Sequence, residues 1–139
     1  MTWNFTYEQL LDRAYKSMPD IVKEESRFEL PIIKSHLSGN KTIISNLEQV
    51  AKDLRRDVSH FFKFMLRELA TTGDVKNSEY IFVGKFRGEF LQNKIEKYAK
   101  EFVFCGQCGK PDTHLVREVA TDFLVCEACG AKASVRKLK

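Results

Sequence analysis

The chain has 139 residues, with 23 lysines and arginines against 19 aspartates and glutamates, so its net charge is only +4. This length fits one ordinary domain, and no apolar stretch approaches the roughly 20 residues that a membrane-spanning helix needs. Residues 1–7 have neither a basic start nor an apolar run, so we expect no secretory signal, no membrane partner and a cytoplasmic location.

The first predicted element is a short amphipathic helix. Thr6 and Gln9 have the spacing of a capping box. Behind them one helical face carries the apolar residues Tyr7, Leu10, Leu11, Ala14 and Met18. Pro19 ends this helix, and the charged segment 20–27 has no clear period and is interpreted as a linker. Because so short a helix is marginal alone in water, its apolar face must be covered either by the rest of the chain or by another protein.

The next segment predicts a strand followed by a helix. The pair Gly39-Asn40 indicates a turn into a short strand, Lys41–Ile44. Ser45 and Glu48 have the spacing of a second capping box. The helix that they open would bury the apolar residues Leu47, Val50, Ala51 and Leu54.

Asp57 is the expected N-cap of another helix, which places apolar residues on a helical repeat at Val58, Phe61, Phe62, Met65, Leu66 and Leu69. Gly73-Asp74 predicts a turn into a strand within 80–86. Because Tyr80 to Val83 is apolar on both faces, this strand is expected in the centre of a sheet.

A glycine-containing loop at 84–88 follows that strand, but it lacks the pattern of a phosphate-binding loop and is expected to end the strand and start a helix. The helix, 87–100, would turn Phe90, Leu91, Ile95 and Tyr98 toward the sheet, and 102–104 is predicted as a last strand. Residues 28–104 thus read as a small sheet covered by helices, with most of the eleven phenylalanines in its core.

The last 35 residues contain all four cysteines. Two pairs, Cys105-x-x-Cys108 and Cys126-x-x-Cys129, are separated by seventeen residues, the spacing of a zinc ribbon. Glycines in or after each pair, Gly106, Gly109 and Gly130, suit the sharp turns of the knuckles. Disulfides of a secreted protein and redox-active pairs are the alternatives. Four thiolates would complete the tetrahedron of one structural Zn²⁺, with no position open for catalysis.

The cysteine segment is too short to build its own core, so binding of zinc, which is worth about 10–16 kcal/mol in such units, would make it a second folding unit. A hairpin of 114–119 with 123–125 would bring the two knuckles together. His114 is expected to be a surface residue because four cysteines complete the site. The sequence therefore predicts an α+β protein with a helix (1–18), a linker (19–27), a central α/β domain (28–104) and a zinc ribbon with a basic tail (105–139).

The tail contains no acidic residue within its last ten positions but four basic ones, Lys132, Arg136, Lys137 and Lys139. Such a tail suits the phosphate backbone of a nucleic acid, and a merely solvated terminus is the alternative. Of the three histidines, only His60 invites a role as a base, and no nucleophile or carboxylate partner can be assigned to it. We therefore expect no enzyme and no small-molecule substrate.

Several strings resemble the beta subunit of translation initiation factor two, in its short archaeal-type form. They run from just after the first helix into the ribbon, and they are Arg27–Pro31, Gly39–Asn46, Arg55–His60, Phe104–Cys108, Pro111–Thr113 and Cys126–Ala131. The Pro-Asp-Thr string inside a four-cysteine ribbon, joined to the upstream Gly-Asn-x-Thr strand, is much more specific than the ribbon alone.

The resemblance implies a subunit of a heterotrimeric factor that delivers methionyl initiator tRNA to the small ribosomal subunit. The GTP site would belong to the gamma subunit, with an alpha subunit as the third partner. The first helix would dock on gamma through Tyr7, Leu10, Leu11, Ala14 and Tyr15. Two alternatives remain. One is an activator of the GTPase similar to initiation factor five, for which Arg13 is the first available arginine, and the other is a zinc-ribbon transcription protein that binds DNA.

Overall fold

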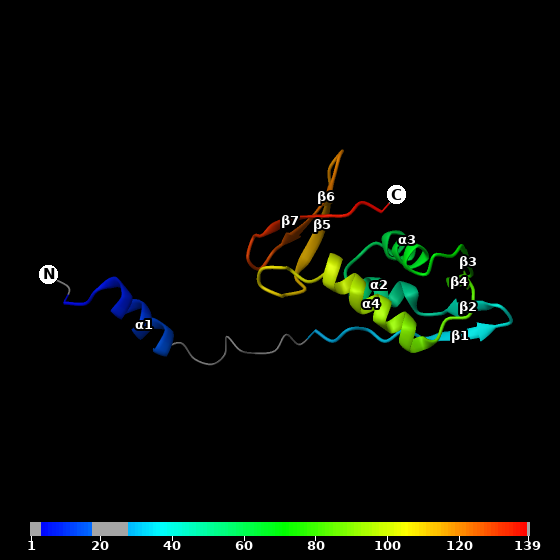
Figure 1. Cartoon of the computed structure of the whole chain (residues 1–139), viewed down its shortest axis with the longest axis horizontal. Helices are drawn as coiled ribbons and strands as arrows, with labels where there is room; N and C mark the ends of the chain where they lie inside the picture. Colours follow the sequence, from blue (N-terminus) through cyan, green and yellow to red (C-terminus); the bar gives the residue numbers. More distant parts are fainter. Residues whose placement is uncertain (1–3, 18–27, 139) are drawn as a thin grey trace.

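The computed structural model of the chain describes residues 4–17 and 28–138. These residues form an isolated helix, a four-stranded sheet with three helices, and a separate three-stranded sheet, so the fold is α+β (Figure 1). In the part of the chain so described, no helix has the length and apolar character needed to span a membrane.

The first helix, α1, runs from Tyr7 to Ser17 and has the predicted capping box. The Thr6 N–H donates to Gln9 Oε1 at 3.1 Å, and the Gln9 N–H donates to Thr6 Oγ1 at 3.4 Å. No residue of α1 is buried against another described residue. Met18, Pro19 and the predicted linker 20–27 lie outside the described residues.

The central sheet is antiparallel with strand order β1-β2-β4-β3. Its strands are β1 (Ser35–Ser38), β2 (Lys41–Ile44), β3 (Gly73–Lys76) and β4 (Glu79–Val83). The turn at Gly39-Asn40 is confirmed, and Gly39 takes the positive φ of 60° that a two-residue hairpin with glycine first requires. The strand β1 was not predicted, because its sequence Ser-His-Leu-Ser is polar and largely exposed.

The predicted turn at Gly73-Asp74 is wrong, because both residues belong to β3. The turn comes four residues later, at Asn77 and Ser78, whose φ values of 49° and 63° fit a two-residue hairpin. The central position of β4 is confirmed, but only one of its faces, with Tyr80 and Phe82, is buried. The helices therefore cover a single face of the sheet.

Three helices pack on that face: α2 (Leu47–Asp53), α3 (Val58–Glu68) and α4 (Gly88–Phe102). Asp57 caps α3 as predicted, accepting from the Ser59 N–H at 3.0 Å. The capping box at Ser45 is wrong, because the N-cap of α2 is Asn46 and no side chain caps it. The Asn46 amide instead accepts from the Lys34 N–H at 2.7 Å and donates to the Ile32 carbonyl at 2.8 Å. It thereby holds the incoming chain.

The last helix corrects two further predictions. Since α4 continues to Phe102, and the N–H groups of Val103 and Phe104 both bond to the Ala99 carbonyl, 102–104 is the end of a helix and not a strand. Phe90 is exposed and stacks on Phe86, 6.2 Å between ring centroids, instead of facing the sheet.

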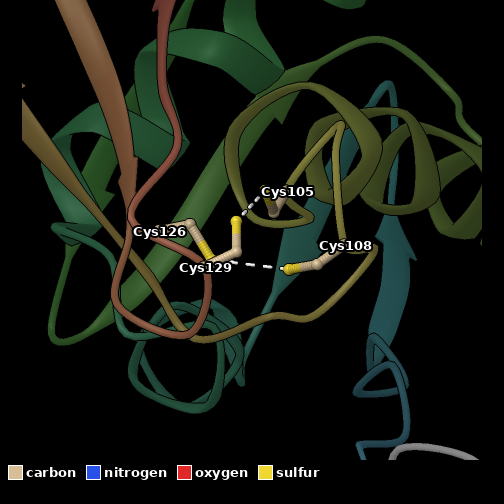
Figure 2. A group of neighbouring side chains, drawn as sticks. All are labelled: Cys105, Cys108, Cys126 and Cys129. Carbon is tan, nitrogen blue, oxygen red and sulfur yellow. Dashed lines mark hydrogen bonds between the residues drawn. The ribbon is translucent and has the colours of Figure 1, made fainter. Parts of the chain in front are cut away.

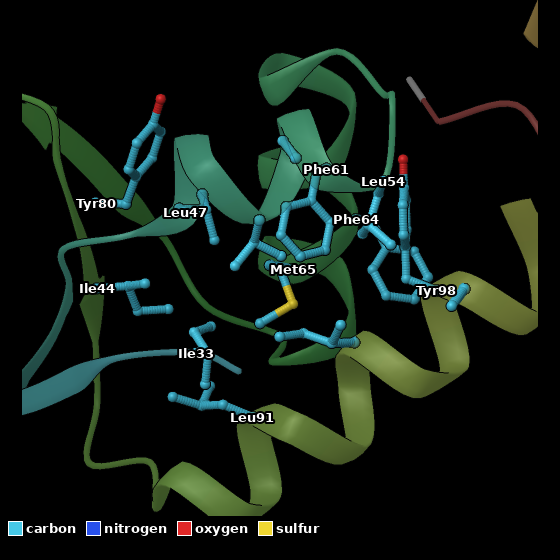
Figure 3. Packing of buried hydrophobic residues seen from close by; sticks show 14 of the residues in the cluster. Ile33, Ile44, Leu47, Leu54, Phe61, Phe64, Met65, Tyr80, Leu91 and Tyr98 are labelled. Carbon is cyan, nitrogen blue, oxygen red and sulfur yellow. The ribbon is translucent and has the colours of Figure 1, made fainter. Parts of the chain in front are cut away.

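The core lies between the sheet and the helices (Figure 3). It contains the predicted inward residues of α2, together with Phe61 and Met65 of α3 and Leu91, Ile95 and Tyr98 of α4. Phe64 and Phe102, which the sequence pattern did not single out, are fully buried beside Tyr98. Most of the aromatic side chains therefore pack edge-on in one cluster.

The C-terminal part forms a second antiparallel sheet of order β5-β6-β7. Its strands are β5 (Thr113–Arg117), β6 (Asp122–Cys126) and β7 (Lys132–Val135). The predicted hairpin is confirmed as β5 and β6. The third strand, β7, was not predicted, because Lys-Ala-Ser-Val is short and mostly exposed.

A buried arginine joins the two parts of the molecule. Arg56, which follows α2, donates to the Phe102 carbonyl from Nε at 3.0 Å and from Nη2 at 2.7 Å. The same guanidinium donates to the Thr113 carbonyl at 2.9 Å and to Thr113 Oγ1 at 2.6 Å. Leu138, in the segment after β7, is buried in the core of the central part. The ribbon therefore packs directly on the central domain.

Candidate metal centre

The four cysteine thiols meet at one end of the ribbon (Figure 2). All four Sγ atoms lie within 4.8 Å of one another. The nearest pairs link the two knuckles, with Cys105 Sγ to Cys129 Sγ at 3.6 Å and Cys108 Sγ to Cys126 Sγ at 3.5 Å. Cys105 and Cys126 are buried, whereas Cys108 and Cys129 are exposed. The two predicted pairs thus form one cluster.

The two knuckles have the same backbone hydrogen bonds. The N–H of Gly109 donates to the Cys105 carbonyl at 2.9 Å, and the N–H of Gly130 donates to the Cys126 carbonyl at 3.0 Å. Both glycines have positive φ, 71° and 76°, where other residues are strained. The predicted need for glycine holds at these two positions but not at Gly106, whose φ is not in that region.

Backbone N–H groups also face the sulfur atoms. The N–H groups of Cys108 and Gln107 hydrogen-bond to the Cys105 sulfur, the latter at 3.4 Å, and lower the pKa of that thiol to about 6. For Cys129, the N–H of Ala131 acts in the same direction, but the adjoining Cys105 thiol and burial outweigh it and raise the pKa to about 12. Four close thiols cannot all ionise without a cation among them.

The donor set fits a tetrahedral metal ion. Ligands about 2.3 Å from a central ion lie about 3.8 Å apart at the corners of a tetrahedron, close to the 3.5 and 3.6 Å between these sulfurs. A disulfide would bring two sulfurs to about 2.05 Å, so the cysteines are not paired covalently. The cluster can therefore hold one metal ion with four sulfur ligands.

His114 lies on β5 outside this cluster. Its Nδ1 is 3.1 Å from Glu127 Oε1, and both side chains are about half exposed. The position agrees with the predicted surface histidine. The site is tied to the central domain through the same strand, because Thr113, which accepts from Arg56, is the cross-strand partner of Cys126.

The basic tail does not stand free of acidic groups. Lys132 Nζ lies 2.8 Å from Glu118 Oε1 and 4.2 Å from the centroid of the Phe123 ring. Arg136 pairs with Glu68 of α3 at 3.2 Å and with Glu101 of α4 at 2.8 Å. These acids are far away in sequence, so no local signal could have revealed the pairing.

The remaining tail residues differ from these two. Lys137 Nζ donates to the Val119 carbonyl at 3.3 Å, and Lys139 lies outside the described residues. Contact between the tail and a nucleic acid stays a prediction. The docking face on α1 also stays a prediction, although its members, Tyr7, Leu10, Leu11, Ala14 and Tyr15, are all exposed.

Sequence reasoning missed the residues that join the ribbon to the central domain. Arg56 was read together with its neighbour Arg55, yet Arg56 is buried and the Arg55 side chain is 73% exposed. His60 and Asp122, which approach each other from α3 and β6, were assigned no partner. A single buried charge beside an exposed one leaves no trace in the hydrophobic period, so no signal in the chain could separate them.

Comparison with known proteins agrees with this architecture. Residues 19–132 match the model of a domain found in the beta subunit of initiation factor two and in initiation factor five. The translation initiation factor 2 subunit beta of Methanopyrus kandleri is 44% identical over 97% of this chain and 98% of its own length. The proteins of the same name from Methanococcus vannielii and Methanosphaera stadtmanae are each 42% identical, over 96% and 95% of this chain and 97% and 93% of their own lengths.

The matches cover the central domain and the ribbon together, in the order that the structure has them. The residues that the family model matches include all four cysteines, and the relatives match nearly the whole chain. The chain therefore belongs to the family of archaeal-type translation initiation factor 2 beta subunits.

Proposed function

We propose that the protein is the non-catalytic adaptor of a heterotrimeric, GTP-dependent initiation factor. It docks through α1 on the GTPase (gamma) subunit, with an alpha subunit completing the factor. The complex delivers methionyl initiator tRNA to the small ribosomal subunit in the cytoplasm. The printed names of the relatives support a subunit of an initiation factor, and the partners are our inference from the family resemblance.

The exposed apolar face of α1 is the observation that favours docking. The helix is capped at its start, yet Tyr7 is 77% and Leu11 is 40% exposed. An amphipathic helix with no partner among residues 4–17 and 28–138 fits the recognition mode in which an apolar face lies in a hydrophobic groove of another protein. The groove would belong to gamma.

The metal in this proposal is one structural Zn²⁺ held by the four cysteines. Zinc prefers tetrahedral thiolate sites, and a site with four protein sulfurs leaves no position for water or substrate. When bound, the ion would hold the two knuckles together. The chain's own part is to present the sulfurs from two matching turns and to orient them with backbone N–H groups.

Substitution on the helix face tests the docking. Changing Leu10 and Leu11 together to aspartate places two charges on the apolar face, so co-purification with gamma should fall at least a hundredfold while the metal content stays at one ion per chain. Lys16→Asp is the matched control, because it changes the net charge by the same amount on the polar face. It should leave binding within about threefold, since exposed charges contribute little.

Unchanged binding by the double variant would refute docking through α1. Equal loss in the Lys16 variant would also count against it, because the effect would then come from charge and not from the apolar face.

A further inference from the structure

The structure contains a polar cavity at the joint between the central domain and the ribbon. It has a volume of about 260 Å³ and lies between α3, the β5–β6 hairpin and the segment after β7. Its lining includes Ser59, His60, Lys63, Arg117, Asp122 and Lys137. None of these residues belongs to the metal cluster, and none is part of the docking face on α1.

Two buried polar atoms of this cavity lack a hydrogen-bond partner among the described residues. They are His60 Nε2 and Asp122 Oδ1, and each residue is only 4% exposed. The other ring nitrogen of His60, Nδ1, is already bonded to the Tyr98 hydroxyl at 2.9 Å. Buried polar atoms in folded proteins nearly always have a partner, so the pair calls for a group that can both accept and donate a hydrogen bond.

The rim of the cavity is basic. Lys63 and Arg117 are exposed and form no ion pair with any acidic residue in the described ranges. Lys137, the third cation, bonds to the Val119 carbonyl. This contrasts with Lys132 and Arg136 of the tail, which are neutralised by acids. The three rim cations come from different elements, and so spread positive charge along the rim.

We propose that this cavity binds a ribonucleotide unit of an RNA strand. The sugar 2′-hydroxyl accepts from His60 Nε2–H and donates to Asp122 Oδ1, and the adjoining phosphates contact Lys63, Arg117 and Lys137. A hydroxyl is both donor and acceptor, and the 2′-hydroxyl is the group by which proteins tell RNA from DNA. Asp122 disfavours a phosphate at that depth, so the anion lies at the rim.

Water alone is the competing occupant. The cavity is several times larger than the roughly 30 Å³ that one water fills in the liquid, so waters could satisfy the two buried atoms without any ligand. Water predicts no discrimination between RNA and DNA, whereas a bound ribose does. The inference relies on the proposed function only for placing the chain beside RNA, and it does not involve gamma.

The test uses the full chain and a short fluorescent uridine RNA, with its 2′-deoxyuridine counterpart, in anisotropy titrations over a series of salt concentrations. The variant K63Q/R117Q removes two phosphate contacts from exposed positions and should not affect folding. Its affinity for RNA should fall about 25-fold at 0.1 M salt, and the salt slope should fall by about 1.4. The control K85Q/R87Q removes the same charges outside the cavity and should change binding less than threefold.

The hydroxyl contact has its own readout. The natural chain should bind RNA about five- to tenfold more tightly than DNA, a ratio typical of one or two hydrogen bonds. Asp122→Ala should bring this ratio to about one without weakening DNA binding. Equal affinity of the natural chain for RNA and DNA would overturn the ribose contact, and equal losses in K63Q/R117Q and its control would overturn the site. Because gamma is absent, neither result depends on the docking experiment.

Discussion

At the scale of single residues, Arg56 shows what a buried charge requires. Its guanidinium donates to two carbonyl oxygens and one hydroxyl from two separate segments, around Phe102 and Thr113. Burial lowers its pKa, yet the group has no carboxylate partner among the described residues and is held by dipoles instead. Removal of the side chain would leave those buried acceptors without donors, which is more costly than losing the bonds themselves.

We therefore expect Arg56→Gln to lower the free energy of unfolding by about 2–4 kcal/mol, measured by urea denaturation. Arg55→Gln is the control, since its pair with Asp112 spans 3.8 Å between side chains that are 73% and 51% exposed. That variant should stay within about 0.5 kcal/mol of the natural chain. Similar losses in both variants would show that burial at Arg56 is not the cause.

Glu68 is a second residue on which elements converge. Hydrogen bonds from Lys97, Arg136 and Lys94 lower its pKa from 4.5 to about 2, against burial, which acts in the opposite direction. A carboxylate with a depressed pKa in the folded state stabilises the protein above its unfolded pKa and loses that contribution as the pH falls from about 4.5 to about 2. Acid should therefore loosen the contact between α3, α4 and the tail.

The expected effect is modest because Lys97 and Arg136 are about half exposed. Glu68→Gln should lower stability by about 1–2 kcal/mol at pH 7, and its difference from the natural chain should vanish near pH 2. Thermal unfolding across this pH range measures both. Glu118→Gln, which breaks the half-exposed pair with Lys132, should have little effect at any pH. A pH-independent deficit in the Glu68 variant would exclude the ionic explanation.

At the scale of elements, sequence patterns located every helix but not every boundary. The repeat of Phe61 and Met65 in α3 and the cysteine spacing were readable because each depends on local geometry. The false capping box at Ser45 arose because Asn46 takes its partners from Ile32 and Lys34, twelve or more residues earlier in the chain. No local pattern records such contacts.

The missed strands have a related cause. Both β1 and β7 are four residues long, at sheet edges and mostly exposed, so they show little alternation of apolar and polar residues. Their hydrogen bonds come from the neighbouring strand and not from their own preference. The candidate site divides in the same way, since the cysteines were predictable but the acids opposite Lys132 and Arg136 were not.

At the scale of the whole molecule, the ribbon and the central part are not independent. Leu138 belongs to the buried core, and Leu115 and Val135 of the ribbon pack against it. Thr113 connects Arg56 on one side with Cys126 on the other through the β5–β6 register. The prediction of two separate folding units from 28–104 and 105–139 therefore becomes a question of how strongly they couple.

Removal of the metal measures that coupling. With excess chelator and reduced thiols, amide signals of β5, β6 and β7 should lose their dispersion in nuclear magnetic resonance spectra. The central domain should also lose about 2–4 kcal/mol of stability, because Arg56 and Leu138 lose their partners. Added zinc should restore both. Unchanged unfolding of the central domain after chelation would mean that the two parts fold separately.

The capping box of α1 has a consequence for how tightly the chain would hold gamma. An eleven-residue helix is only partly formed when alone, and the measured affinity of a ligand falls in proportion to the fraction of molecules in the competent shape. The bonds between Thr6 and Gln9 raise that fraction. These two side chains would therefore tune the lifetime of the complex without touching the partner, so the attachment could stay reversible while every contact remained the same.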